Sequence, residues 1–347
     1  MKNILKLLVI LIILCALGLF LLYKTTDASS FGIGYVFFEE YSIGIYKLFY
    51  DGSQFHCQPF KEGINPVLTS KNITDTKARF VADPFLIYKE PYWYMFFEVL
   101  TVLRSGGVGL AISKDLIDWK YKGIVLKEPF HLSYPFVFQD NGKFYMIPES
   151  GLDKSVRLYE AVDFPYKWHF VKHLLKGRDY SDNTLINYGN KWWLFTSSSN
   201  STNLYLYYSD NIGGPWIEHP MSPIVKDDAN KARCGGNIIR LNEKLIRIAK
   251  DDFPEYGSTV CTFEIIKLNT EEYKEKELEN NPLLEGSGSG WNSFGMHQLS
   301  AHKISDNEWI ACVDGKRFKK EGCFYVRLPK SITQYLRSLK SLIFMRK

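Results

Sequence analysis

The sequence predicts an all-β chain that folds as a five-bladed β-propeller, with an N-terminal transmembrane helix and a short C-terminal helix. An apolar strand, a turn and an aromatic strand that ends on a polar residue recur along the chain, with copies that start at Asp83, Tyr134, Asp182, Gly236 and His297. These starts lie 51, 48, 54 and 61 residues apart, which is typical of a four-stranded blade. Aromatic residues make up 16% of the chain and favour strand-rich packing.

Residues 1–24 predict a transmembrane signal anchor, and residues 25–30 a linker. Leu7 to Leu22 is an apolar run of sixteen residues with lysines on both sides, and Tyr23 makes it barely long enough to span a bilayer. A cleaved signal peptide is the alternative, because its apolar core is commonly about 7–15 residues long. No small-x-small cleavage site closes the run. We therefore expect a single-pass anchor with a cytosolic N-terminus and an extracytoplasmic or luminal propeller.

The propeller is expected over residues 31–327, since no Pro-, Gly- or Ser-rich linker divides the repeats. Blade one reads DPFLIY, YWYMFFEV, GVGLAISK and WKYKGIVL, and blade two reads YPFVFQD, KFYMIPE, VRLYEAV and WHFVKHLL. Blade three takes TLINY, KWWLFTSS, LYLYYSD and a strand at Trp216, and blade four takes NIIRL, KLIRIAKD, TVCTFEIIKL and YKEKEL. Trp119, Trp168 and Trp216 hold the same place in three blades, which indicates packing between blades.

Blade five is incomplete in sequence order. QLSAHKI and EWIACVDG supply two strands, and CFYVRL supplies a third. The strand-like segment that precedes blade one, residues 35–60, has no blade of its own. We expect it to complete blade five, because joining both ends of the chain closes the ring and hides the sheet edges. Cys312 and Cys323 could then face each other across a hairpin.

Residues 328–347 predict a basic amphipathic helix, which either packs against the propeller or rests on anionic lipid. The net charge of the chain is +5, to which the N-terminal lysines contribute +3 and the residues from Arg327 onward +6. Subtracting these +9 leaves the body at −4, so no nucleic-acid partner is expected.

The hairpins predict a shared rim, because the start of an inner strand and the end of its antiparallel partner lie at the same end of a blade. This rule joins Asp83 with Glu98, Tyr134 with Glu149, Asp182 with Ser197, Asn237 with Lys250 and Asp251, and His297 with Asp314 and Arg317. Loops that enter the rim add Arg79, His131, Arg178 and Arg233. Acids, amides and aromatic rings suit a polyhydroxylated ligand, so these residues are candidates for binding a glycan or glycolipid.

Two carboxylates of this rim suit glycoside hydrolysis, with Asp83 as the base and Asp182 or Glu149 as the acid. Inversion requires the two groups to lie about 6.5–9.5 Å apart. Each residue also has a structural alternative: Asp83 and Asp182 could cap turns, and Glu149 could pair with an arginine. His297 could be an ordinary hydrogen-bonding residue, or could hold a water or a cation on the axis. No other cofactor or metal is predicted.

The Asp83-Pro84 start and the five-blade layout resemble glycoside hydrolase family 43 and its relatives. The resemblance implies that Asp83 is the base. In that family a second aspartate, on blade two, tunes the pKa, and a glutamate on blade three is the acid. In this sequence Tyr134 stands at the position of that aspartate, and Asp182 stands at the position of that glutamate.

A more extensive resemblance covers about residues 65–317. NPVL, FVADPF, YMFFE, FHLSYPFVF, YMIPES, LYEAVDFP, WWLF, Arg233-x-Gly235-Gly236, Tyr256-Gly257 and Val313-Asp314-Gly315 together resemble the N-terminal domain of plant glucosamine inositolphosphorylceramide transferases and similar bacterial domains. In the plant proteins a glycosyltransferase domain follows the propeller, and this implies a possible association with a separate glycosyltransferase. Three hypotheses stay open: a membrane-anchored glycosidase-like enzyme, a non-catalytic glycan-recognition module, and a scaffold without a sugar ligand.

Overall fold

The computed structural model describes residues 31–103, 105–198, 200–253 and 255–326. One unit, residues 39–318, contains the inner strands of all five sheets, and the described segments 31–38 and 319–326 belong to a second unit. No helix among the described residues is long and apolar enough to cross a membrane. The predicted anchor at 1–24, the linker at 25–30 and the helix at 328–347 lie outside the described residues, so these three boundaries stay predictions.

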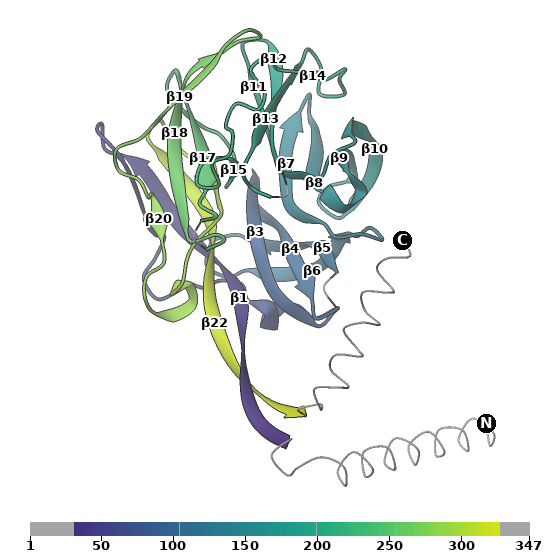
Figure 1. The fold of residues 1–347 in the computed structure, drawn as a ribbon, viewed down its shortest axis with the longest axis vertical. Coiled ribbons are helices and arrows are strands. Elements are labelled where there is room, and N and C mark those ends of the chain that lie inside the picture. Colours follow the sequence, from purple (N-terminus) through teal and green to yellow (C-terminus); the bar gives the residue numbers. More distant parts are fainter. Residues whose placement is uncertain (1–30, 104, 199, 254, 327–347) are drawn as a thin grey trace, which may run out of the picture. The chain divides into compact units, whose positions relative to one another are not determined.

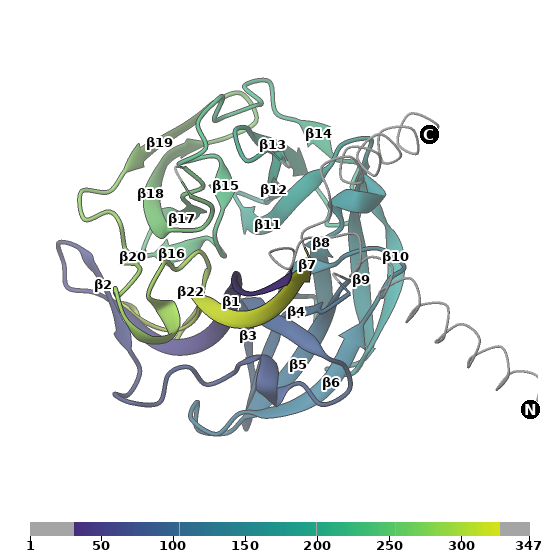
Figure 2. The same ribbon diagram turned by 60° about the horizontal axis from the view of Figure 1, so that its bottom comes forward.

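Five antiparallel sheets succeed one another around a common centre, as Figure 2 shows, so the predicted all-β five-bladed propeller is confirmed. Blade one consists of β3 (Ala78–Lys89), β4 (Tyr92–Thr101), β5 (Gly106–Ser113) and β6 (Lys120–Leu126). Blade two consists of β7 (Ser133–Asp140), β8 (Lys143–Glu149), β9 (Ser155–Asp163) and β10 (Lys167–Lys176). Blade three consists of β11 (Tyr180–Tyr188), β12 (Lys191–Ser198), β13 (Leu204–Ser209) and the short β14 (Ile217–Glu218).

Blade four departs from the four-strand plan at both edges. Its inner edge is split into β15 (Arg233–Cys234) and β16 (Ile239–Leu241), which both pair with β17 (Lys244–Lys250). Beyond β18 (Thr259–Leu268), the outer edge is shared by β19 (Tyr273–Glu277) and β20 (Leu284–Glu285). Short 3₁₀ turns precede β3, β9 and β21, at Ser70–Asn72 (η2), Gly151–Asp153 (η3) and Gly290–Asn292 (η4).

Blade five joins the two ends of the described chain (Figure 1). Its strand order is β21 (Leu299–Lys303), β22 (Glu308–Val326), β1 (Phe31–Tyr50) and β2 (Phe55–Pro59). The prediction that residues 35–60 complete this blade is therefore confirmed. One detail is wrong: residues 323–326 extend β22 and do not form a separate third strand. Cys312 and Cys323 consequently belong to one continuous strand and do not face each other across a hairpin, and Cys312 is a buried free thiol.

Packing between neighbouring blades fills the core with aliphatic and aromatic side chains. Trp168 of blade two lies edge-on to Phe96 of blade one, with ring centroids 5.5 Å apart. Trp119 belongs to a buried cluster that includes Ile310 of blade five. These contacts agree with the inter-blade role that the repeated tryptophans predict.

Candidate functional site

Backbone irregularities occur on the inner strands of three blades, at the residues where the sequence repeats start. Asp83, Tyr134 and Asp182 have φ angles of 50°, 43° and 51°, although none is glycine. The pairing register of β3, β7 and β11 shifts next to each of them. Non-glycine residues with positive φ cost roughly 1–3 kcal/mol and cluster at functional sites. The same device in three blades therefore marks this rim as the candidate site.

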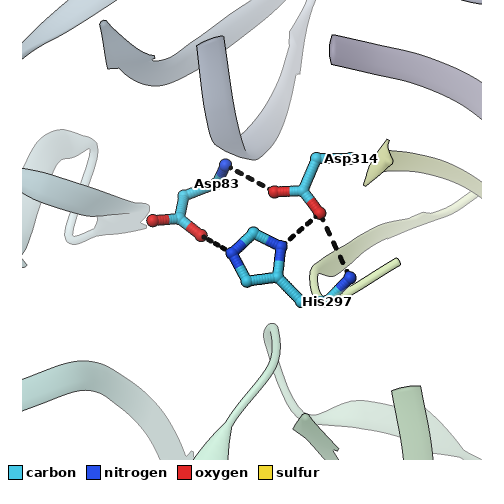
Figure 3. A group of neighbouring side chains, drawn as sticks. All are labelled: Asp83, His297 and Asp314. Carbon is cyan, nitrogen blue, oxygen red and sulfur yellow. Dashed lines mark hydrogen bonds and ion pairs between the residues drawn. The ribbon is translucent and has the colours of Figure 1, made fainter. Parts of the chain in front are cut away.

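Asp83, His297 and Asp314 form a buried cluster between blades one and five (Figure 3). His297 Nδ1 lies 2.6 Å from Asp314 Oδ1, and His297 Nε2 lies 3.5 Å from Asp83 Oδ1. The backbone N–H of Asp83 donates to Asp314 Oδ2 at 2.9 Å. Asp314 thus orients both the imidazole ring and the strand that carries Asp83.

The Asp83 carboxyl is held in an environment that resists ionisation. Burial raises its pKa to about 6, and the positive charges of Lys250 and His297 oppose that rise. Its Oδ2 accepts a hydrogen bond of 3.3 Å from the backbone N–H of Tyr134, while the buried Oδ1 accepts no hydrogen bond from the described residues. A carboxyl group with a pKa of about 6 is ionised at neutral pH and can accept a proton.

Two cations hold Asp182 in its ionised form. Lys250 Nζ lies 2.9 Å from Asp182 Oδ2, and Arg233 Nε donates to the same oxygen. Burial acts to raise the pKa of Asp182, but the charges of Arg233 and Lys250 outweigh it and lower the pKa to about 2. Lys250 is itself buried, and together with Arg233 it keeps Asp182 ionised. Asp182 therefore has no proton to donate near neutral pH.

Glu149 lies beside the same arginine, yet its carboxyl is expected to be protonated. Burial and the negative charge of Asp182 raise its pKa to about 8, against the opposing charge of Arg233, whose Nη2 lies 3.6 Å away. Glu149 Oε2 also accepts a hydrogen bond of 3.2 Å from the backbone N–H of Asp182. The side chain is 18% exposed, so a ligand at the rim can reach it.

Glu98 of β4 pairs with His131, which lies in the loop between β6 and β7. His131 Nε2 lies 3.2 Å from Glu98 Oε1. Burial acts to lower the pKa of His131, but the hydrogen bond to Glu98 and the charge of Glu98 outweigh it. The pKa of His131 is therefore raised above that of a free histidine.

Tyr134 is fully buried next to the charged groups. Its hydroxyl lies 2.8 Å from Thr184 Oγ1 and donates to the carbonyl of Gly236 at 3.1 Å. Lys250 Nζ lies 5.8 Å from the centroid of the Tyr134 ring. Tyr134 thus packs under the rim and ties blades two, three and four together.

The structure places four predicted rim residues in structural contacts. Asn237 bridges to blade five through both backbone groups of Ala301, and Arg317 pairs with Glu40 on β1 at 2.7 Å. Arg178 points to the outer strand of blade three, where it donates to Tyr207 and Glu218. Asp251 accepts a hydrogen bond from the N–H of Phe253 within its own loop. Arg79 lies half-buried on β3, four residues before Asp83.

Sequence reasoning missed four side chains that complete the site, and they are Tyr41, Ser201, Asp252 and Tyr256. The Tyr256 ring lies 5.1 Å from the guanidinium of Arg233 and 5.5 Å from the His297 ring, and the Tyr41 ring is tilted by 39° to the His297 ring, with centroids 4.9 Å apart. Ser201 and Asp252 contact Arg233. All four come from loops or from β1, where strand alternation gives no signal; only the Tyr256-Gly257 motif could have indicated one of them.

The Asp83, His297 and Asp314 cluster also offers a set of metal ligands. One ligand atom from each residue lies within 4.8 Å of the others. A buried carboxylate oxygen without a hydrogen bond, Asp83 Oδ1, fits a cation at this place. The short contact between His297 and Asp314 would have to open for the imidazole to act as a ligand through Nδ1.

Comparisons with known proteins agree with this fold. A glucosamine inositolphosphorylceramide transferase 1 from Oryza sativa subsp. japonica is 37% identical over 267 residues, which are 73% of this chain and 36% of the relative. A protein of the same name from Arabidopsis thaliana is 32% identical over 311 residues, 82% of this chain and 40% of the relative. This chain therefore spans little more than a third of these relatives. A 1,2-beta-oligomannan phosphorylase from Thermoanaerobacter sp. is 32% identical over 124 residues, 33% of this chain and 40% of that protein.

Solved structures of carbohydrate-active enzymes share the architecture. The catalytic domain of the Coprinopsis cinerea GH62 alpha-L-arabinofuranosidase superposes with a TM-score of 0.52 and 11% identity, covering 69% of this chain and 91% of that one. The alpha-L-arabinanase of Cellvibrio cellulosa gives 0.50 and 18%, with coverage of 70% and 92%. At such identities the likeness shows the fold alone. Residues 56–316 match the family described as "Glucosamine inositolphosphorylceramide transferase 1, N-terminal", and this chain belongs to that family.

Proposed function

We propose that this propeller is a membrane-anchored, glycosidase-like enzyme that cleaves a glycosyl bond at the rim with Glu149 as general acid and Asp83 as general base. The observation that carries the proposal is the contrast in contacts among three neighbouring carboxyl groups: Lys250 Nζ at 2.9 Å and Arg233 Nε hold Asp182 ionised, whereas burial raises the pKa of Glu149 to about 8 and that of Asp83 to about 6. Groups whose environments push their pKa values apart suit opposite roles in proton transfer. Of the two acids that the sequence suggests, Glu149 is favoured.

Each residue has a distinct part in the proposed reaction. Glu149 gives its proton to the leaving oxygen, and Asp83 takes a proton from the attacking nucleophile on the other face of the sugar ring. Asp182 stays ionised and holds Arg233 and Lys250 in position. His297 and Asp314 fix the orientation of the Asp83 carboxylate.

The nucleophile is either water or inorganic phosphate. Water corresponds to the hydrolases that share the fold, and phosphate is suggested by the name of the oligomannan phosphorylase that resembles part of this chain. Assays in the presence and absence of phosphate distinguish the two cases.

A non-catalytic glycan-recognition module that assists a separate glycosyltransferase is the second candidate. It is favoured by the relatives, whose names describe a transferase and of whose length this chain covers 36–40%. Here the same rim would bind a glycan or glycolipid without breaking a bond.

A glycan screen of the full chain in detergent tests the proposal, with sugar release and binding both measured. Asp83→Asn and Glu149→Gln should each reduce release at least about 100-fold, which is the usual contribution of a general acid or base. Glu160→Gln is the matched control, because Glu160 lies on β9 and pairs with Lys143 at 2.9 Å. Binding without release in the wild type would instead support the recognition module, and neither binding nor release would support the scaffold.

A further inference from the structure

A cavity of about 350 Å³ lies at the ends of the inner strands that point away from the candidate site. The inner strands β7 and β11 carry Tyr134 and Asp182 at the candidate site. Gln139 and Asn187, which lie at the other ends of these two strands, line the cavity, and side chains of blades four and five complete its wall. Its volume is within the range of small-ligand sites, which is about 300–1,000 Å³.

Tyr134 separates the cavity from the candidate site along β7. Its side chain is fully buried, its backbone N–H donates to Asp83 Oδ2 at 3.3 Å, and its hydroxyl donates to the carbonyl of Gly236 at 3.1 Å. Phe136, two residues further along β7, already belongs to the wall of the cavity. The cavity is therefore a second candidate site, distinct from the acidic rim.

Aromatic rings from three blades give the cavity an apolar wall. Phe138 of blade two and Trp192 of blade three are both half-buried, and their ring centroids lie 5.6 Å apart. Trp309 of blade five, which is 2% exposed, also lines the cavity. Because half-buried rings can still contact a ligand, this wall suits a molecule with a flat apolar face.

The charged residues of the cavity are both cations. Arg240 on β16 and Lys303 on β21 line it, and no aspartate or glutamate is among the lining residues that the structure describes. Arg240 Nη2 donates to the carbonyl of Asn187, and the guanidinium forms no ion pair with a described residue. Lys303 pairs at 3.2 Å with Asp306, whose side chain is 90% exposed, and such exposed pairs contribute little. The positive charge at the cavity is therefore largely uncompensated.

We infer that this cavity binds a small molecule that joins an anionic group to a flat apolar ring. In this site Arg240 binds the anion, and Phe138 and Trp192 contact the ring. A guanidinium binds carboxylate and phosphate groups through paired hydrogen bonds, so both anions fit. Exposed cations alone are ordinary on a protein surface, but two cations beside aromatic rings, without an acid, favour such a ligand. The inference goes beyond the proposed function and does not depend on it.

Ligand-detected NMR of the full chain in detergent tests the inference with three small probes. Benzoate and phenyl phosphate carry an anion on a ring, and benzyl alcohol is their neutral counterpart. We expect at least one of the anionic probes to bind at least about tenfold more tightly than benzyl alcohol, because hydrogen bonds between charged groups are stronger than neutral ones. The two anionic probes distinguish a carboxylate ligand from a phosphate ligand, and a sample of detergent alone corrects for partition into micelles.

Three variants place the binding in the cavity. Arg240→Gln should weaken binding of the anionic probe at least about tenfold and leave that of benzyl alcohol unchanged. Trp192→Leu should weaken the binding of every probe that binds, because it removes ring contact. Lys267→Gln is the matched control and should change nothing, since Lys267 lies on β18, pairs with Glu272 and does not line the cavity.

Two results would overturn the inference. Neither anion binding more tightly than benzyl alcohol would show that the cavity does not select an anionic ring compound. An anionic probe whose affinity is the same in Arg240→Gln and Lys267→Gln would bind elsewhere on the protein. Sugar release is not measured in this experiment, so failure of this inference and failure of the proposed function are distinguishable.

Discussion

Neighbouring charges, and not burial alone, give the three rim carboxyls different properties. Asp83 and Asp182 are buried and Glu149 is half-buried, and burial acts to raise the pKa of each. Only Asp182 contacts both Lys250 and Arg233 closely enough for their charges to reverse this effect. Residue type and strand position are the same for Asp83 and Asp182, so the sequence could not distinguish a proton acceptor from a permanent anion.

For the proposed reaction, the plot of the rate of sugar release against pH should be bell-shaped. Asp83 must be ionised, so activity should fall as the pH drops below about 6, and Glu149 must be protonated, so activity should fall as the pH rises above about 8. Because the two groups interact, the limbs report apparent values of the pair. Glu149→Gln should abolish the alkaline limb along with most of the rate, and a profile that keeps rising above pH 8 would contradict this assignment.

Lys250→Met should destabilise the propeller by about 3 kcal/mol at neutral pH, because a buried aspartate loses one of its two cations. Chemical denaturation measures this change. Lys191→Met is the matched control: Lys191 pairs at 2.6 Å with Asp210, which is 77% exposed, so the cost should stay below about 1 kcal/mol. Equal effects of the two substitutions would show that Asp182 does not depend on Lys250.

Much of the site followed from the rule that hairpin ends share a rim. Asp83, Asp182, Lys250, His297 and Asp314 lie together as that rule predicts. Asn237 and Arg317, which the same rule assigns to the rim, contact Ala301 and Glu40 of blade five, and Arg178, assigned to a loop of the rim, contacts Glu218. Strand periodicity places a residue on a blade, but tertiary packing decides where a flexible side chain points.

At the scale of the strand, bulges and close approaches shape the centre of the propeller. Gly236 occupies in blade four the place that Asp83, Tyr134 and Asp182 occupy in the first three blades, and its φ is 155°. A Cβ atom there would come within 1.7 Å of the carbonyl oxygen of Leu299. The repeat in the sequence showed the equivalence of these positions but not the reason for a glycine.

Gly236→Ala should therefore cost more than about 3 kcal/mol of stability or prevent folding, since the obstacle is backbone and cannot move aside. Gly213→Ala is the control, because its nearest neighbour would be the flexible Lys172 side chain at 3.9 Å, and it should change stability by less than about 0.5 kcal/mol. Thermal denaturation of both variants measures these changes in stability. A fully stable Gly236→Ala protein would mean that blades four and five are not packed this closely.

At the scale of the whole molecule, closure of the ring was predictable and membrane attachment stays a prediction. The unassigned strands at both ends of the repeat could pair only with each other, and β1 and β22 do pair in blade five. The continuous course of β22 was not predictable, because the glycines and lysines that interrupt its apolar pattern also occur in turns.

If the predicted anchor is correct, the full chain should remain in the membrane fraction after extraction with alkaline carbonate, since a spanning segment such as the one predicted for residues 7–23 resists this treatment. Replacing Leu11 and Leu14 with aspartate should release the protein, because each charge in the bilayer costs about 2.5–3.5 kcal/mol. A mature N-terminus near residue 29 would instead indicate a cleaved signal peptide.

The central claim is that Glu149 carries a proton at neutral pH beside an ionised Asp182. Difference infrared spectroscopy between the wild type and Glu149→Gln, recorded across a pH titration, measures the protonated carboxyl directly. We predict a protonated signal at pH 6 that disappears with a midpoint near 8. A carboxylate that is already ionised at pH 6 would contradict the account.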